Sequence, residues 1–191
     1  MTTILIIPGL REHVAEHWQT HLAERLSTCR TVVAPASDKV NMVARLHAID
    51  EAVETIEGPI IAVAHSAGVA MFVHWVNFRV RPIDGALLVT PPDLSMELPQ
   101  GYPSLRQLAA NGWLPVPRKR LPFPSIVAAS DNDHLASFGA VEQMARDWGS
   151  RLHRLGSVGH MNPASGYGDW PAGDTLISGL RDETAAHEAA T

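Results

Sequence analysis

Three residue types that together could perform nucleophilic catalysis occur in order along the chain. Ser66 directly follows an apolar run, Asp131 and Asp133 follow a second such run, and His160 follows a third. A serine hydroxyl is a poor nucleophile until a histidine accepts its proton, and the histidine needs a carboxylate to orient it. The order and positions of these residues therefore predict serine-dependent acyl transfer.

The surroundings of Ser66 predict a sharp turn between a strand and a helix. Residues Ile60–Ala64 are apolar on both faces, as in a central parallel strand, and a helix is expected over Ala67–Phe78. A nucleophile at such a turn needs small residues two positions before and two after it, here Ala64 and Gly68. The simpler alternative is that Ser66 only caps the helix.

Two aspartates compete for the role of the acid. Asp131 and Asp133 both lie in the loop after the expected strand Ser125–Ala129, and their spacing does not separate them. One of them could instead brace the turn or cap the helix expected to begin near Ser137. The carboxyl edge of a parallel sheet is where functional groups gather, so either position suits an active site.

The expected base and the oxyanion donors also lie in loops after strands. His160 follows Arg151–Leu155, in a glycine-containing loop that can turn back over the sheet. The alternative is that His160 is an ordinary histidine on the protein surface. An acyl-transfer site also needs two N–H donors for the developing oxyanion. The residue after the nucleophile, Ala67, and the loop after the first strand, at Leu10, are the candidates.

The elements that must position these residues alternate between strand and helix. This alternation predicts an α/β fold with a mostly parallel sheet covered on both faces. The expected strands are Thr3–Ile7, Thr31–Ala34, Ile60–Ala64, Gly85–Val89, Ser125–Ala129 and Arg151–Leu155. The expected helices are Glu12–Leu26, Val40–Ile56, Ala67–Phe78, Ser137–Trp148 and Asp174–His187, with a frayed tail over 182–191.

One stretch interrupts the alternation. Residues 91–122 contain seven of the chain's 14 prolines. Long irregular segments in compact domains are often lids or binding loops. The alternative is a rigid surface connection with one short helix near Ser104–Ala110.

Composition excludes several classes of protein. The chain has 191 residues, which favours a single domain over 1–191, and 46% of them are hydrophobic, which excludes a disordered chain. No apolar run is long enough to span a membrane. The formal charge of −5 argues against a nucleic-acid partner. The one cysteine, Cys29, is expected to be a small buried residue. The presence of only one cysteine, together with the expected lack of a secretory signal, favours a cytoplasmic location.

A zinc-protease pattern is present on the first expected helix. His13, Glu16 and His17 fit H-x-x-E-H, and His21 extends the series on the same helix face. We expect a polar helix face here instead, because the pattern follows the first strand of an α/β unit, which is not the setting of such sites. No metal site and no cofactor are expected.

Nearly the whole chain resembles the small serine hydrolases of the α/β-hydrolase superfamily, the family of YdeN and retinoblastoma-binding protein nine. The resemblance rests on five blocks of sequence. They are Ile7-Pro8-Gly9-Leu10, His17-Trp18-Gln19, His65-Ser66-Ala67-Gly68, Ala129-Ser130-Asp131-Asn132-Asp133, and Gly159-His160-Met161-Asn162 with its continuation to Trp170-Pro171.

The resemblance implies a three-layer α/β/α sandwich, a minimal α/β-hydrolase fold with no large cap. It also implies a Ser66–His160–Asp133 triad, and so selects Asp133 over Asp131. Ala64 departs from the glycine more usual in the family. The expected function is hydrolysis of a carboxylic ester, thioester or amide of a small acyl substrate. The alternatives are a binding protein that retains the fold without turnover and a metallohydrolase that uses His13 and His17.

Overall fold

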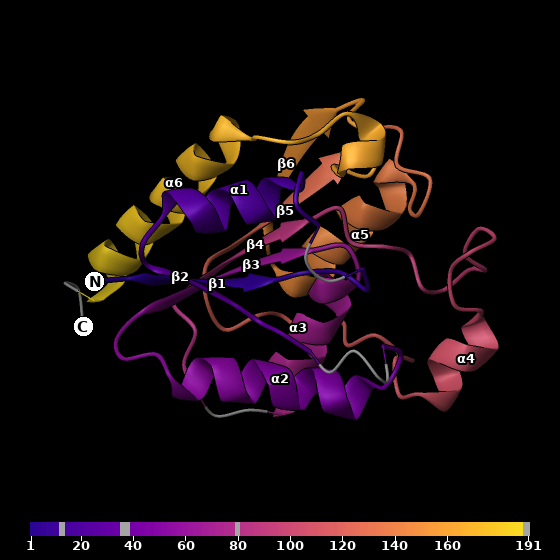
Figure 1. The fold of residues 1–191 in the computed structure, drawn as a ribbon, viewed down its shortest axis with the longest axis horizontal. Coiled ribbons are helices and arrows are strands. Elements are labelled where there is room, and N and C mark those ends of the chain that lie inside the picture. Colours follow the sequence, from indigo (N-terminus) through magenta and orange to yellow (C-terminus); the bar gives the residue numbers. More distant parts are fainter. Residues whose placement is uncertain (12–13, 35–38, 79–80, 189–191) are drawn as a thin grey trace.

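A six-stranded parallel sheet forms the centre of the molecule (Figure 1). The computed structural model describes residues 1–11, 14–34, 39–78 and 81–188, with side chains as far as residue 184. The strand order is β2-β1-β3-β4-β5-β6, and all neighbouring strands are parallel. The strands are β1 (Thr3–Ile7), β2 (Cys29–Thr31), β3 (Ile60–His65), β4 (Gly85–Val89), β5 (Ser125–Ser130) and β6 (Arg151–Gly156).

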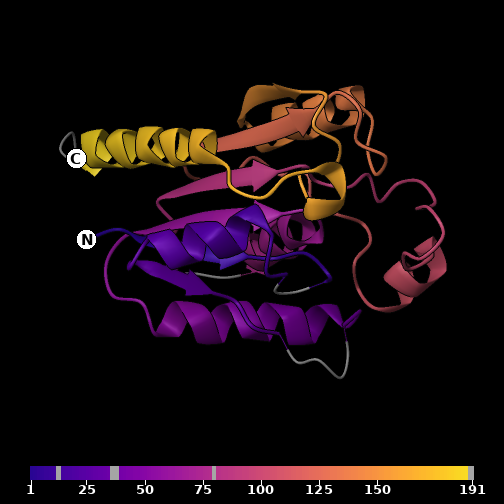
Figure 2. The same ribbon diagram turned by 45° about the horizontal axis from the view of Figure 1, so that its top comes forward.

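Helices cover both faces of this sheet (Figures 1 and 2). Helices α1 and α6 lie on one face, and α2, α3 and α5 lie on the other, each burying an apolar face against the strands. The helices are α1 (Trp18–Arg25), α2 (Met42–Glu54), α3 (Ala67–Phe78), α4 (Leu105–Ala110), α5 (Phe138–Trp148) and α6 (Pro171–Glu188). One turn of 3₁₀ helix, Pro163–Ser165, precedes α6.

The core divides into two layers because side chains alternate along each strand. On β3, Ile61 and Val63 pack toward α1 and α6, whereas Ala62 and Ala64 pack toward α2 and α3. All six residues of β3 are buried, as the continuous apolar run predicts for a central strand. The strand that carries the nucleophile candidate at its end is therefore fully enclosed, as are its neighbour β4 and the next strand, β5.

The predicted α/β fold class is confirmed, with a sheet that is entirely parallel. Outside the three layers, the described residues form no large cap; the main addition is the segment 91–122, which crosses the carboxyl edge of the strands and carries the short helix α4 (Figure 1). In the described part of the chain, no helix is both long and apolar enough to cross a membrane.

Two of the predicted element boundaries are wrong near the N-terminus. The first helix begins at Trp18 rather than Glu12, because the His17 side chain accepts a hydrogen bond from the N–H of Gln19 and caps the helix there. Residue 12 itself lies outside the described residues. The second strand ends at Thr31, where the expected strand begins, and Val33 beyond it is 78% exposed.

Candidate active site

Ser66 occupies a tight turn between β3 and α3. Its φ of +56° lies in the left-handed region, which a non-glycine residue rarely adopts. The turn brings α3 very close to β1: a Cβ added to Gly68 would lie 2.3 Å from the carbonyl oxygen of Ile7. This close approach explains why the position two residues after the serine must be glycine, and the backbone strain is of the kind found at functional sites.

The structure brings Ser66, His160 and Asp133 into one hydrogen-bonded chain. The Oγ of Ser66 lies 2.7 Å from Nε2 of His160, and Nδ1 of His160 lies 2.8 Å from Oδ2 of Asp133. Because the carboxylate can only accept, Nδ1 carries the proton and Nε2 is free to accept from the serine. The side chains of His160 and Asp133 are 4% and 1% exposed.

The second aspartate lies outside this chain. Asp131 accepts a hydrogen bond from Nε of Arg154 on β6, at 2.7 Å, on the exposed edge of the sheet. Asp133 instead accepts the N–H of Leu135 with its other oxygen, which fixes its carboxylate toward His160. The structure therefore separates two residues that the spacing in the sequence left equivalent.

The loop that carries His160 is held by side chains from several elements. His65, at the end of β3, donates from Nε2 to the carbonyl oxygen of His160 at 2.9 Å, and Ser165 Oγ accepts the N–H of His160 at 3.1 Å. Asn132 Oδ1 accepts the N–H of Gly159 at 2.7 Å. The peptide groups around the imidazole are thus fixed on both sides.

His65 and Asn132 have no role that follows from the sequence. Both belong to the sequence blocks around the triad candidates, so proximity to those residues was the available signal. The sequence does not show in which direction these two side chains point. His65 follows Ala64 on the strand, and its side chain enters the layer of α1, opposite the layer of α3.

Two buried histidines behind the site are held in the neutral form. Burial, followed by the nearby His160 and His21, lowers the pKa of His17 to about 4. Burial, followed by His160 and His17, lowers the pKa of His65 well below its ordinary value. Their ring centroids lie 4.6 Å apart, and the Trp18 indole packs edge-on against His65. A neutral His65 keeps the single N–H that its bond to the His160 carbonyl requires.

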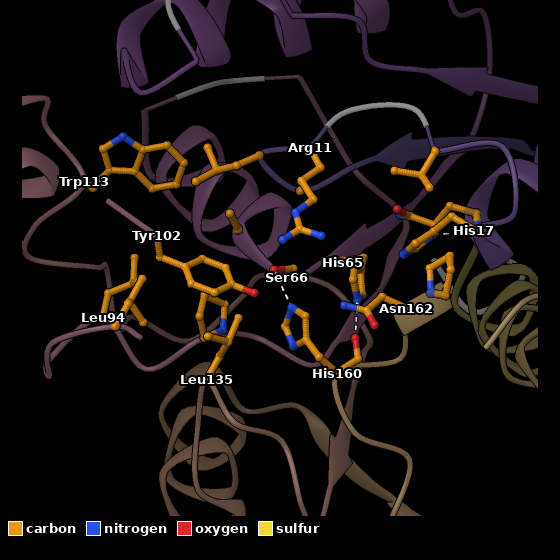
Figure 3. Close-up of a pocket in the computed structure, with 18 of the residues that line it drawn as sticks. Arg11, His17, His65, Ser66, Leu94, Tyr102, Trp113, Leu135, His160 and Asn162 are labelled. Carbon is orange, nitrogen blue, oxygen red and sulfur yellow. Dashed lines mark hydrogen bonds between the residues drawn. The ribbon is translucent and has the colours of Figure 1, made fainter. Parts of the chain in front are cut away.

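The triad opens into a largely apolar cavity (Figure 3). The space inside the cavity, together with its open mouth, amounts to about 920 Å³. The two predicted oxyanion donors, Leu10 and Ala67, line it together with Ser66. Ala67 is the first residue of α3, so its N–H has no acceptor within the helix and is available to a ligand.

One wall of the cavity comes from the proline-rich segment. This segment contributes Pro92, Leu94, Leu98, Tyr102, Leu108 and Trp113. Trp113 is fully buried; its indole N–H donates to the carbonyl oxygen of Val40, and its own carbonyl accepts from Nε2 of His74. The Tyr102 hydroxyl lies 3.2 Å from Nε2 of His134, next to the Asp133 loop. Hydrogen bonds therefore connect the segment to the rest of the protein at several points.

The zinc-protease pattern does not form a helical site. His17 caps α1 from outside the helix, so Glu16 and His17 are not on the helix with His21, and His13 lies outside the described residues. The expectation of one helix face shared by the three histidines was wrong because the helix starts late. Among the described residues, no group of three or more His, Cys, Asp or Glu side chains is arranged so that it could hold a metal ion.

A parallel sheet covered by helices, with a strained serine after its central strand and a histidine and an aspartate at its carboxyl edge, defines an α/β hydrolase. Residues 4–179 match the model of the serine hydrolase family. The chain belongs to that family, and this membership supports hydrolase activity. No match to the sequence was found among curated proteins.

Several solved structures share the fold. A putative YdeN-like hydrolase from Pectobacterium atrosepticum is 25% identical, with a TM-score of 0.83 over 96% of this chain and 92% of that one. The ydeN gene product of Bacillus subtilis is 18% identical, with a TM-score of 0.73 over 95% and 100%. Est1E from Butyrivibrio proteoclasticus, solved with bound ferulic acid, is 12% identical, with a TM-score of 0.69 over 99% and 90%.

Proposed function

We propose that this protein hydrolyses carboxylic esters of small acyl substrates through an acyl-enzyme on Ser66. The observation that carries the proposal is the hydrogen-bonded chain from Ser66 Oγ through His160 to Asp133, open to an apolar cavity. Thioesters and amides present the same acyl carbon and are the secondary substrate classes. Since one free cysteine suits a reducing compartment, we place the activity in the cytoplasm.

The proposed reaction has two halves and needs no cofactor. Ser66 Oγ attacks the acyl carbon while His160 Nε2 accepts its proton, and the proton then passes to the leaving alcohol. Water next attacks the acyl-enzyme with the same imidazole as base, which releases the acid and restores Ser66. Asp133 stabilises the positive charge that His160 carries in both halves.

The oxyanion of each tetrahedral intermediate needs donors that are in place beforehand. We propose the N–H groups of Leu10 and Ala67, which flank Ser66 in the cavity wall. Gly9, which precedes Leu10, lies directly against the serine: a Cβ there would be 3.3 Å from Cβ of Ser66. A larger residue at position 9 would therefore crowd the nucleophile.

Hydrolysis of 4-nitrophenyl esters, from acetate to decanoate, tests the proposal. We expect the wild type to release nitrophenol fastest from short and medium chains, because the cavity is closed on one side by the segment 91–122. In Ser66→Ala, kcat should fall by roughly 10³-fold or more. Equal rates in the two proteins would contradict the proposed nucleophile, and binding without turnover in both would favour a binding protein.

A further inference from the structure

Arg11 places a positive charge directly beside the proposed nucleophile. It follows the oxyanion-hole candidate Leu10, and both residues line the cavity that contains Ser66. Figure 3 shows the Arg11 side chain extending into the cavity, with its guanidinium group turned toward Ser66. The side chain is exposed to solvent at the cavity mouth, so an incoming substrate can reach it.

No negative charge balances this arginine among the cavity-lining residues that the structure describes. None of the described residues that line it is an aspartate or a glutamate, although the whole chain carries 20 of them against 15 lysines and arginines. Asp133 lies behind the His160 ring, where its side chain is 1% exposed. His17 and His65, which line the cavity beside His160, are neutral near pH 7 because their pKa values are lowered.

Within the described part of the chain, the Arg11 guanidinium also lacks an internal partner. No hydrogen bond or ion pair joins it to a side chain or a carbonyl group of those residues. Other arginines of the chain are paired, as Arg25 is with Asp169 and Asp174, and Arg154 is with Asp131. An unpaired guanidinium offers two parallel N–H donors, and a carboxylate is the group that matches them.

We propose that Arg11 forms an anion subsite, and that the preferred substrates are esters that carry a carboxylate near the scissile bond. The apolar wall, with Leu94 and Trp113, holds the hydrocarbon part, while Arg11 binds the carboxylate by a charge-assisted pair of hydrogen bonds. The inference rests on the proposed function, since it names a substrate class for the same site.

Matched pairs of esters test the subsite. On the leaving-group side, the pair is 4-acetoxybenzoate and 4-acetoxybenzamide; on the acyl side, it is the monophenyl ester of adipic acid and its terminal carboxamide. In each pair a carboxylate is replaced by a neutral group of nearly the same shape. We expect the wild type to prefer the carboxylate in at least one pair by roughly tenfold or more in kcat/KM, and added salt to reduce this preference.

Arg11→Gln should reduce that ratio to near one, and Arg11→Lys should retain part of it. Arg146→Gln is the matched control, because Arg146 is exposed on α5 and its loss changes the net charge equally. The proposal is overturned if the wild type shows no carboxylate preference in either pair, or if Arg11→Gln leaves the ratio unchanged.

Binding to the inactive protein separates this proposal from the proposed function. In Ser66→Ala, calorimetric titration should show the carboxylate of at least one pair binding more tightly than its carboxamide, and adding Arg11→Gln should remove the difference. Equal binding within both pairs would overturn the anion subsite. If instead the wild type hydrolyses no ester while the binding difference persists, the proposed function fails and the anion subsite stands.

Discussion

At the scale of single residues, the proposed mechanism requires one particular aspartate to face His160. Asp133 is buried and bonded to the imidazole, whereas Asp131 is paired with Arg154 at the exposed edge of β6. The two residues are only two positions apart, so they form a matched pair for substitution. The loop turns one carboxylate inward and the other outward, and only the inward one can stabilise a protonated imidazole.

Asp133→Asn should therefore lower kcat/KM by a factor on the order of 10⁴, because an amide stabilises neither the correct tautomer nor the imidazolium. Asp131→Asn should leave kcat/KM within about fivefold of the wild type, since an exposed ion pair contributes at most ~1 kcal/mol. Steady-state hydrolysis of 4-nitrophenyl butyrate measures both. Similar losses in the two variants would contradict the assignment of the acid.

The three triad candidates could be found in the sequence because each lies directly after a strand of a parallel sheet. Arg11 and His65 could not be assigned roles in the same way. Their neighbours in the sequence are visible, but the direction of a side chain at a strand end depends on the register and twist of the sheet. His160 forms hydrogen bonds with Ser66, Asp133 and His65, which lie 94, 27 and 95 residues away in the chain, and only the folded structure brings them together.

At the scale of the elements, the contact between β1 and α3 sets the geometry of the nucleophile turn. Gly68 touches the backbone of β1 so closely that no side chain fits. Ala64, on the opposite side of the serine, is fully buried in β3, and the structure accommodates its methyl group in the α3 layer. The departure from glycine at position 64 is thus compatible with the turn, whereas one at position 68 is not.

Gly68→Ala should destabilise the protein by at least about 2 kcal/mol, because β1 and α3 must move apart to admit the methyl group. Gly179→Ala is the control, since Gly179 lies within α6 with no atom near its would-be Cβ, and alanine there should stabilise by up to ~1 kcal/mol. Urea unfolding followed by circular dichroism measures both. Comparable stabilities for the two variants would contradict the close contact.

Element boundaries were less predictable than element order. The apolar spacing of the sequence indicated a helix from Glu12, yet α1 begins only at Trp18, after the His17 cap. Helix caps made by histidine are uncommon, so the usual Ser, Thr, Asp or Asn signal was missing. By contrast, α6 begins at Pro171, earlier than predicted, at a position where proline suits the first helical turn.

At the scale of the whole molecule, buried neutral histidines link stability to pH. His17 and His65 have lowered pKa values in the folded protein, whereas both titrate near 6.5 when unfolded. Below that value the unfolded chain takes up protons that the folded protein does not accept. Their contribution to stability is therefore complete above about pH 7 and decreases as the pH falls.

The free energy of unfolding should thus fall between pH 8 and pH 5, by on the order of 2 kcal/mol for each such histidine. His17→Gln should reduce the pH dependence of the free energy of unfolding by the equivalent of about one bound proton. Urea titrations at pH 8, 7, 6 and 5 measure this free energy. A value that is constant or rises on acidification would contradict the buried neutral histidines.

The most direct test of the central claim is labelling by a fluorophosphonate, which reacts with a serine only where a base activates it. We predict one adduct per chain by intact-protein mass spectrometry, located on Ser66 by peptide mapping, and none in Ser66→Ala or in heat-unfolded protein. A folded wild type that remains unlabelled, or a Ser66→Ala variant that is labelled equally, would contradict the account.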